Sequence, residues 1–178
     1  MLSQRVEDSL APVIARWSSK DKELLWPQFQ EISTGRVTEL FGITSEPTPH
    51  RISVDGRSLF TCCALVAHTS SAIFGKPVTI VSTDPVSSGD VRIHISEELE
   101  LQDVDPQASF GSLVDCEANE LLTDPRTKFC CHVEHFTCAE SGAEFCNQDS
   151  RRYLVQIEDF HAAAQKLFYR IWGSQARR

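Results

Sequence analysis

The sequence has no hydrophobic segment of the kind that marks a membrane or secreted protein. Its longest apolar stretch, Leu59 to Val66, is far shorter than the run of about 20 residues that a membrane-spanning helix needs. The N-terminus carries acidic residues early and lacks the apolar core of a secretory signal. We therefore predict a protein without a membrane partner, and we expect it in the cytoplasm.

Positive charge is also scarce. The chain has 17 Lys and Arg against 25 Asp and Glu, which gives a formal net charge of -8. A nucleic-acid binder needs a concentrated basic surface to contact phosphates. The only basic cluster is a short terminal one, formed by Arg170, Arg177 and Arg178. We therefore predict no nucleic-acid partner.

No internal repeat or low-complexity tract divides the 178 residues, so one main domain is expected. Apolar residues recur at helical spacing over residues 4–18 and again over 20–32. Pro47 and Pro49 then mark a loop. These patterns predict a short helical N-terminal segment at residues 1–49.

The rest of the chain mixes strand and helix patterns. Alternating β-branched or apolar residues predict strands at residues 51–54, 78–81, 91–95 and 153–157. Apolar residues over 59–74 and 160–172 predict helices. The sequence therefore predicts an α+β fold, in which a core domain at residues 50–178 has a mixed sheet and flanking helices.

Cysteine is abundant, but the Cys-x-x-Cys spacing typical of structural zinc sites is absent. An odd total of seven cysteines cannot pair completely within one chain. Four of them form two adjacent pairs, Cys62-Cys63 and Cys130-Cys131. A disulfide between adjacent cysteines is strained, whereas thiolates are soft ligands suited to Cu(I) and, by the same argument, Hg(II). Spacing alone does not show whether the two pairs face each other.

The residues around the two pairs carry a family resemblance. Residues 57–65 read RSLFTCCAL and residues 128–133 read KFCCHV. The first segment is similar to the organomercurial (alkylmercury) lyase motif in which Cys-Ala-Leu-Asp opens a helix after a short strand. The second resembles that family's Phe-Cys-Cys-His-Val motif. The resemblance extends over roughly residues 50–172.

The resemblance implies a role for each cysteine pair. In the family, one thiolate from each motif grips the mercury of an organomercurial, and by position these are Cys63 and Cys130. Their neighbours Cys62 and Cys131 are further candidate metal ligands. No resident cofactor is expected, since a soft metal ion, Hg or Cu, would itself be substrate or ligand. The expected partners are therefore a small organometal or soft metal ion, and small thiols.

The proton donor of the reaction is the point at which this chain departs from the family. An aspartate three residues after the first cysteine takes part in proton delivery in the family, and Val66 occupies that position here. Asp84 is the candidate catalytic replacement, although an aspartate before Pro85 is also a common turn residue. Other candidate acids are His68, Glu134 and His135.

We therefore predict an organomercurial-lyase-like protein that binds a soft metal and cleaves a carbon-mercury bond by protonolysis. Two alternatives stay open because of Val66. One is a non-catalytic thiolate binder of Hg(II) or Cu(I), and the other is a divergent thiol-dependent enzyme of specialised metabolism. All three need accessible thiolates of low pKa.

Overall fold

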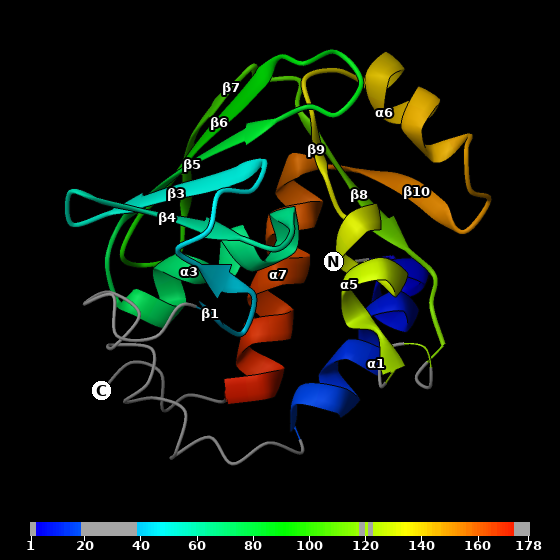
Figure 1. Cartoon of the computed structure of the whole chain (residues 1–178), viewed down its shortest axis with the longest axis horizontal. Helices are drawn as coiled ribbons and strands as arrows, with labels where there is room; N and C mark the ends of the chain where they lie inside the picture. The colour runs from blue at the N-terminus through cyan, green and yellow to red at the C-terminus, as the bar shows by residue number, and fades with distance from the viewer. Residues whose placement is uncertain (1–2, 19–38, 118–119, 121–122, 173–178) are drawn as a thin grey trace.

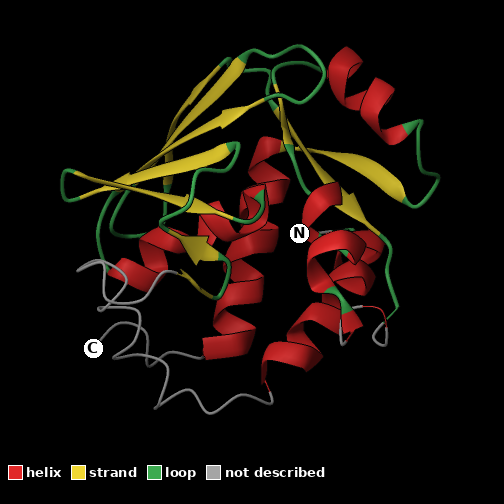
Figure 2. Cartoon of the chain, in the orientation of Figure 1, coloured by secondary structure: helices red, strands yellow, loops and turns green. Residues whose placement is uncertain are grey.

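The computed structural model describes residues 3–18, 39–117, 120 and 123–172, and these form two antiparallel sheets with helices packed against them (Figures 1 and 2). The larger sheet has the order β1-β2-β4-β3-β5-β6-β7. Its strands are β1 (Glu39–Leu40), β2 (Ile43–Thr44), β3 (His50–Val54), β4 (Arg57–Thr61), β5 (Val78–Thr83), β6 (Asp90–Ile95) and β7 (Leu101–Asp105).

The smaller sheet has the order β10-β8-β9. Its strands are β8 (Phe110–Val114), β9 (His135–Phe136) and β10 (Arg152–Gln156). The described helices are α1 (Gln4–Ser18), α3 (Ala64–Phe74), α5 (Pro125–Lys128), the 3-10 helix η1 (Cys130–His132), α6 (Ala139–Cys146) and α7 (Ile157–Trp172).

Helix α3 is the central element of the core. It contacts β3, β4 and β5 on one side and α7 on the other (Figure 1). Nine of its residues are buried, including Leu65, His68 and Ile73. A helix that is buried around most of its circumference has no polar face to give to solvent, so its buried serines, threonine and histidine must find partners inside the protein.

Tight turns explain the direction of the strands. Asp55 and Gly56, both with positive φ, close the β3–β4 hairpin, in which Val54 pairs with Arg57. Phe41 and Gly42 close the β1–β2 hairpin in the same way, with φ values of 52° and 77°. Positive φ at both central residues is the two-residue turn that matches the twist of paired strands. Short hairpins of this kind produce antiparallel neighbours.

The predicted α+β class is confirmed. The helix predicted over residues 4–18 is α1, and the strands predicted near residues 51–54, 78–81 and 91–95 are β3, β5 and β6. The strand pairs among the described residues are all antiparallel, whereas a mixed sheet was expected. The tight hairpins account for the antiparallel β1–β2 and β3–β4 pairs.

Two boundaries also differ. Leu59 to Thr61 belong to β4, so the helix expected from Leu59 begins only at Ala64. The helix expected over 20–32 lies outside the described residues. The division at residues 49 and 50 stays a prediction, although β1 and β2 precede it and continue the same sheet as β4.

No helix in the described part of the chain combines the length and the apolar character needed to cross a bilayer.

Gly42 lets the β1–β2 turn approach the first cysteine pair. A Cβ at Gly42 would lie 2.4 Å from Cys62 Sγ, whereas Gly56, with a similar φ of 72°, has nothing within 4 Å. Both Gly→Ala changes incur the strain of a left-handed backbone, about 1 to 2 kcal/mol. Only Gly42→Ala adds overpacking, which costs about 1 to 3 kcal/mol more. Urea unfolding of the two variants measures this difference, and equal losses of stability would contradict the close approach.

Candidate thiolate metal centre

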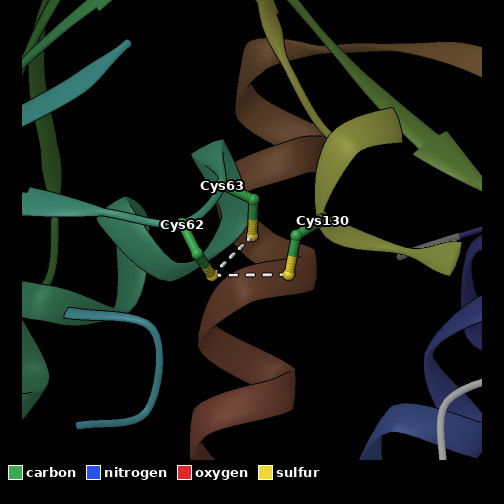
Figure 3. Close-up of side chains that lie close together, drawn as sticks. All are labelled: Cys62, Cys63 and Cys130. Atoms are coloured by element: carbon green, nitrogen blue, oxygen red, sulfur yellow. Dashed lines mark hydrogen bonds between the residues drawn. The ribbon is translucent and has the colours of Figure 1, made fainter. Parts of the chain in front are cut away.

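Three cysteine sulfurs converge at the junction of the two motifs (Figure 3). Cys62 Sγ lies 3.3 Å from Cys130 Sγ and 3.9 Å from Cys63 Sγ. All three sulfurs lie within 4.8 Å of one another. Among the residues that the structure describes, this is the one group of three His, Cys, Asp or Glu side chains whose ligand atoms are close enough to hold a single metal ion. We call it the cysteine cluster.

The backbone around the first pair fixes two of the sulfurs. The Cys62 N–H donates to the Gly42 carbonyl at 2.6 Å, which ties the end of β4 to the β1–β2 turn. Cys63 has an extended backbone and is the N-cap of α3. The Thr61 hydroxyl donates to the Cys63 carbonyl at 3.0 Å. Both side chains therefore leave a short, bonded connection between a strand and a helix.

The second pair is tied directly to the first. The Ala64 N–H, at the start of α3, donates to the Val133 carbonyl at 3.0 Å. Val133 N–H in turn donates to the Cys130 carbonyl at 3.1 Å and closes the turn of η1. The first N–H groups of a helix have no partner within the helix, so this bond satisfies one of them and sets the distance between the motifs.

The cluster has a buried base and an accessible side. Cys63 is 1% exposed, while Cys62 and Cys130 are partly buried. None of the seven cysteines, all of which lie in the described part of the chain, forms a disulfide. A small ion can therefore reach Cys62 and Cys130 before it contacts Cys63.

Two of the three thiols of the cysteine cluster hold their protons more tightly than ordinary cysteines. Hydrogen bonding with Cys130, then with Cys62, and burial raise the pKa of Cys63 well above its usual value. The contact with Cys62, followed by burial, raises the pKa of Cys130. Low-pKa thiolates were expected from sequence, and this expectation is wrong for Cys63 and Cys130. Three neighbouring sulfurs that share protons disfavour a buried negative charge.

The structure places the fourth candidate ligand elsewhere. Cys131 is exposed and its thiol donates to the Thr127 carbonyl at 3.0 Å. Its sulfur is not part of the cysteine cluster. Adjacent residues in a 3-10 turn point in different directions, so one cysteine of the pair faces the site and the other faces solvent.

Cys62 also lies beside the position of the missing aspartate. A Cβ on Gly42 would contact both the Cys62 sulfur and, at 3.4 Å, a methyl group of Val66. The sulfur and the Val66 side chain therefore lie against the same point of the β1–β2 turn. Where the family motif has a carboxylate, this chain has a methyl group with a thiol next to it.

Asp84 lies in the turn between β5 and β6, where its carboxylate accepts five hydrogen bonds. Oδ1 accepts from the Val86 and Ser87 N–H groups, and Oδ2 accepts from Ser141 Oγ and from the N–H and hydroxyl of Thr137. Burial opposes ionisation, but the bonds, from Ser141 first, lower the pKa of Asp84 overall. It is thus ionised at neutral pH, and the contacts fit the turn interpretation better than proton donation.

The core also contains a chain of buried histidines that sequence analysis did not connect. His50 Nδ1 lies 3.0 Å and His135 Nδ1 2.8 Å from Ser82 Oγ. His135 Nε2 lies 3.0 Å from His68 Nε2, and His68 Nδ1 lies 2.9 Å from His161 Nδ1. His161 reaches the Leu99 carbonyl at 2.9 Å. We call these four histidines and Ser82 the histidine chain.

Burial disfavours charge on the two central members of the histidine chain, His68 and His135. Burial, and then the other histidines, lower the pKa of His68 well below its usual value. Burial and His50 do the same for the pKa of His135. Glu134 Oε2 lies 3.0 Å from His50 Nε2 but forms no hydrogen bond. His68 and His135 thus serve as neutral hydrogen-bonding groups of the core. From sequence, only the register of β3 with β5, which pairs His50 with Ser82, could have indicated a link of the histidine chain.

The fold and both motifs have counterparts among known proteins. A family model described as alkylmercury lyase matches residues 43–169 of the 178. The chain belongs to the alkylmercury lyase family. The matched region includes all three residues of the cysteine cluster as well as Val66.

Individual relatives of the alkylmercury lyase family agree with this match. The alkylmercury lyase of Pseudomonas putida is 32% identical over 130 residues, which are 71% of this chain and 59% of that protein. The alkylmercury lyase of Streptomyces lividans is 28% identical over 141 residues, which are 79% of this chain and 63% of the relative. The chain thus spans about three fifths of the length of these relatives.

A solved structure described as the mercury-bound form of MerB2 has the same fold. It superposes with a TM-score of 0.62 at 15% sequence identity and covers 96% of this chain and 93% of that one. At this identity the likeness concerns the fold.

The raised pKa of Cys130 predicts a distinctive reactivity profile. Because only the thiolate is alkylated, the rate of Cys130 modification by iodoacetamide should rise about tenfold per pH unit from pH 6 to 9. Cleavage after Lys128 and Glu134 releases residues 129–134, in which a Cys131→Ser background leaves Cys130 as the one thiol. Mass spectrometry of this fragment follows its modification. A rate that levels off below pH 8 would show a thiolate of low pKa and contradict the prediction.

Ser82 is the point at which the histidine chain can be cut. Ser82→Ala leaves the Nδ1 atoms of His50 and His135 buried without their partner, and should lower the free energy of unfolding by about 2 to 3 kcal/mol. Ser70→Ala is the matched control, since Ser70 is equally buried and its hydroxyl bonds only to the Ala67 carbonyl. Urea unfolding measures both, and a loss for Ser82→Ala no larger than for Ser70→Ala would contradict the bridging role.

Proposed function

We propose that the protein captures the mercury of an organomercurial compound between Cys63 and Cys130 and cleaves the carbon-mercury bond by protonolysis. The observation that supports this proposal is the convergence of the three sulfurs of the cysteine cluster from two distant motifs. Thiolates are the soft ligands that select soft metals. The names of the curated relatives point to the same chemistry.

The cysteine cluster contains every atom that the cleavage needs. One thiol exchanges its proton for the organomercury group and forms a sulfur-mercury bond. As the sulfur of the second thiol binds mercury, the third thiol of the cluster gives its proton to the carbon and takes up the proton that the second thiol loses, so the carbon-mercury bond breaks and the electron pair stays with carbon. The products are a hydrocarbon and mercury held by two sulfurs. No external oxidant or reductant takes part.

Cys62 is our candidate for the proton donor. Its sulfur contacts Cys63 and Cys130 and lies beside Val66, the position at which the family motif has aspartate. A general acid must lie within hydrogen-bonding reach of the atom it protonates. Asp84 does not enter this proposal, because its carboxylate is ionised and already accepts five hydrogen bonds.

Val66 favours a second candidate function. A valine side chain neither donates a proton nor binds a metal, and without an acid the cysteine cluster would form a stable complex and release no hydrocarbon. In this case the protein is a binder of Hg(II) or Cu(I). Either function requires reduced thiols, as in the cytoplasm, and small thiols that remove the bound metal by exchange.

Hydrocarbon release is the test of the lyase proposal. With phenylmercury and excess small thiol, the wild-type protein should release benzene, which headspace gas chromatography detects. Cys63→Ser and Cys130→Ser should abolish release, and Cys62→Ser should slow it by about 100-fold, the contribution of a positioned acid. Cys131→Ser is the control from the same vicinal pair and should keep wild-type activity.

Two outcomes separate the candidate functions. Release of benzene that Cys62→Ser leaves unchanged would rule out Cys62 as the acid. Absence of benzene, with Hg(II) retained at one equivalent, would select the binder. Val66→Asp then shows whether a carboxylate at this position is all that the site lacks.

A further inference from the structure

The spacing of the sulfurs fits a three-coordinate centre better than a linear one. With bonds of about 2.3 Å to sulfur, as for zinc, a linear two-coordinate ion holds its sulfurs about 4.6 Å apart. Three-coordinate ions with such bonds separate them by about 3.4 to 4 Å. The observed distances are 3.3 Å for Cys62–Cys130 and 3.9 Å for Cys62–Cys63. Two of the three sulfur–sulfur distances therefore lie near the range of a three-sulfur site, and the third is no longer than 4.8 Å.

The composition of the cluster points to the kind of ion. It offers three sulfurs, and no histidine or carboxylate ligand atom joins them among the described residues. Structural zinc takes four ligands in a tetrahedron, so this set is incomplete for zinc. A trivalent metalloid with a lone pair, such as arsenic(III), forms three bonds in a pyramid and binds soft sulfur ligands strongly.

We propose that the cysteine cluster also binds inorganic trivalent arsenic, As(OH)3, as a complex with Cys62, Cys63 and Cys130. Three S–H and three As–OH bonds break, and three As–S bonds and three water molecules form. Arsenic stays trivalent and no net charge enters the core. The inference shares with the proposed function only the requirement that these thiols are reduced and accessible.

The route into the site follows from burial. Cys62 and Cys130 are partly exposed and their sulfurs lie 3.3 Å apart, so arsenic first bonds to this pair. Cys63, at 1% exposure, then completes the pyramid from below. The bond between Ala64 N–H and the Val133 carbonyl already holds the motifs together. Such preorganisation reduces the entropy lost on binding.

Arsenite binding to the purified full-length protein tests the inference. Native mass spectrometry should show a gain of one arsenic atom and a loss of three hydrogens, and an arsenic-sulfur absorption band should reach its limit at one equivalent. Cys62→Ser should weaken arsenite binding by at least about 100-fold. Changing a residue that only supports a metal ligand costs up to about 100-fold in affinity, and the loss of a ligand itself should cost more. Cys131→Ser should bind as the wild type does.

The same variants also keep this inference separate from the proposed function. Cys62→Ser retains Cys63 and Cys130, so it should still bind phenylmercury, and this binding confirms that the variant is folded. Failure of the wild type to bind arsenite, with phenylmercury still bound, would overturn the inference and leave the proposed function standing. Arsenite binding that survives Cys62→Ser unchanged would show a two-sulfur site and overturn it as well. If the wild-type protein binds neither arsenite nor phenylmercury, both the inference and the proposed function are wrong.

Discussion

The bond from Ala64 N–H to the Val133 carbonyl is the constraint on which the candidate site depends. It joins the first turn of α3 to the residue that closes η1, so the two cysteine motifs, far apart in sequence, keep a fixed separation. Helix N-termini often use their unpaired N–H groups to hold an anion. Here one such group holds the backbone of the second motif instead, and the sulfurs meet beside it.

Within the cysteine cluster, a thiol lies beside the position at which the family motif has a charged carboxylate. A family site with a carboxylate stores a negative charge near the metal, whereas this chain has Val66 and the neighbouring thiol of Cys62. The pKa values of Cys63 and Cys130 are raised, so these two thiols hold their protons and the cost of burying an unpaired charge is avoided. Under the proposed function, the positive charge of a bound metal would offset the negative charge that the sulfurs acquire as they lose these protons.

Much of the site could be predicted from sequence, because adjacent cysteines and their flanking residues are local features. The roles of Cys62 and Cys131 could not, since the direction of each side chain depends on the end of β4 and the turn of η1. The histidine chain was also hidden. His50, Ser82, His135 and His161 are scattered along the chain, and only the register of β3 with β5 and the packing of α7 on α3 unite them. Helix periodicity located α1 and α7 correctly, but it extended α3 into β4 because a buried strand and a buried helix are both continuously apolar.

The histidine chain has a polarity that no single member can change alone. A neutral imidazole has one N–H and one bare nitrogen, so the direction of donation at one ring dictates the direction at the next, and Ser82 passes the order from His135 to His50. The Leu99 carbonyl can only accept, so His161 Nε2 donates to it and His161 Nδ1 accepts from His68. By the same rule His135 donates to His68, Ser82 donates to His135, and His50 Nδ1 donates to Ser82. A single backbone carbonyl at one end thus sets the direction of every hydrogen bond as far as Ser82 and His50, and Glu134 Oε2 beyond them has no hydrogen-bond partner.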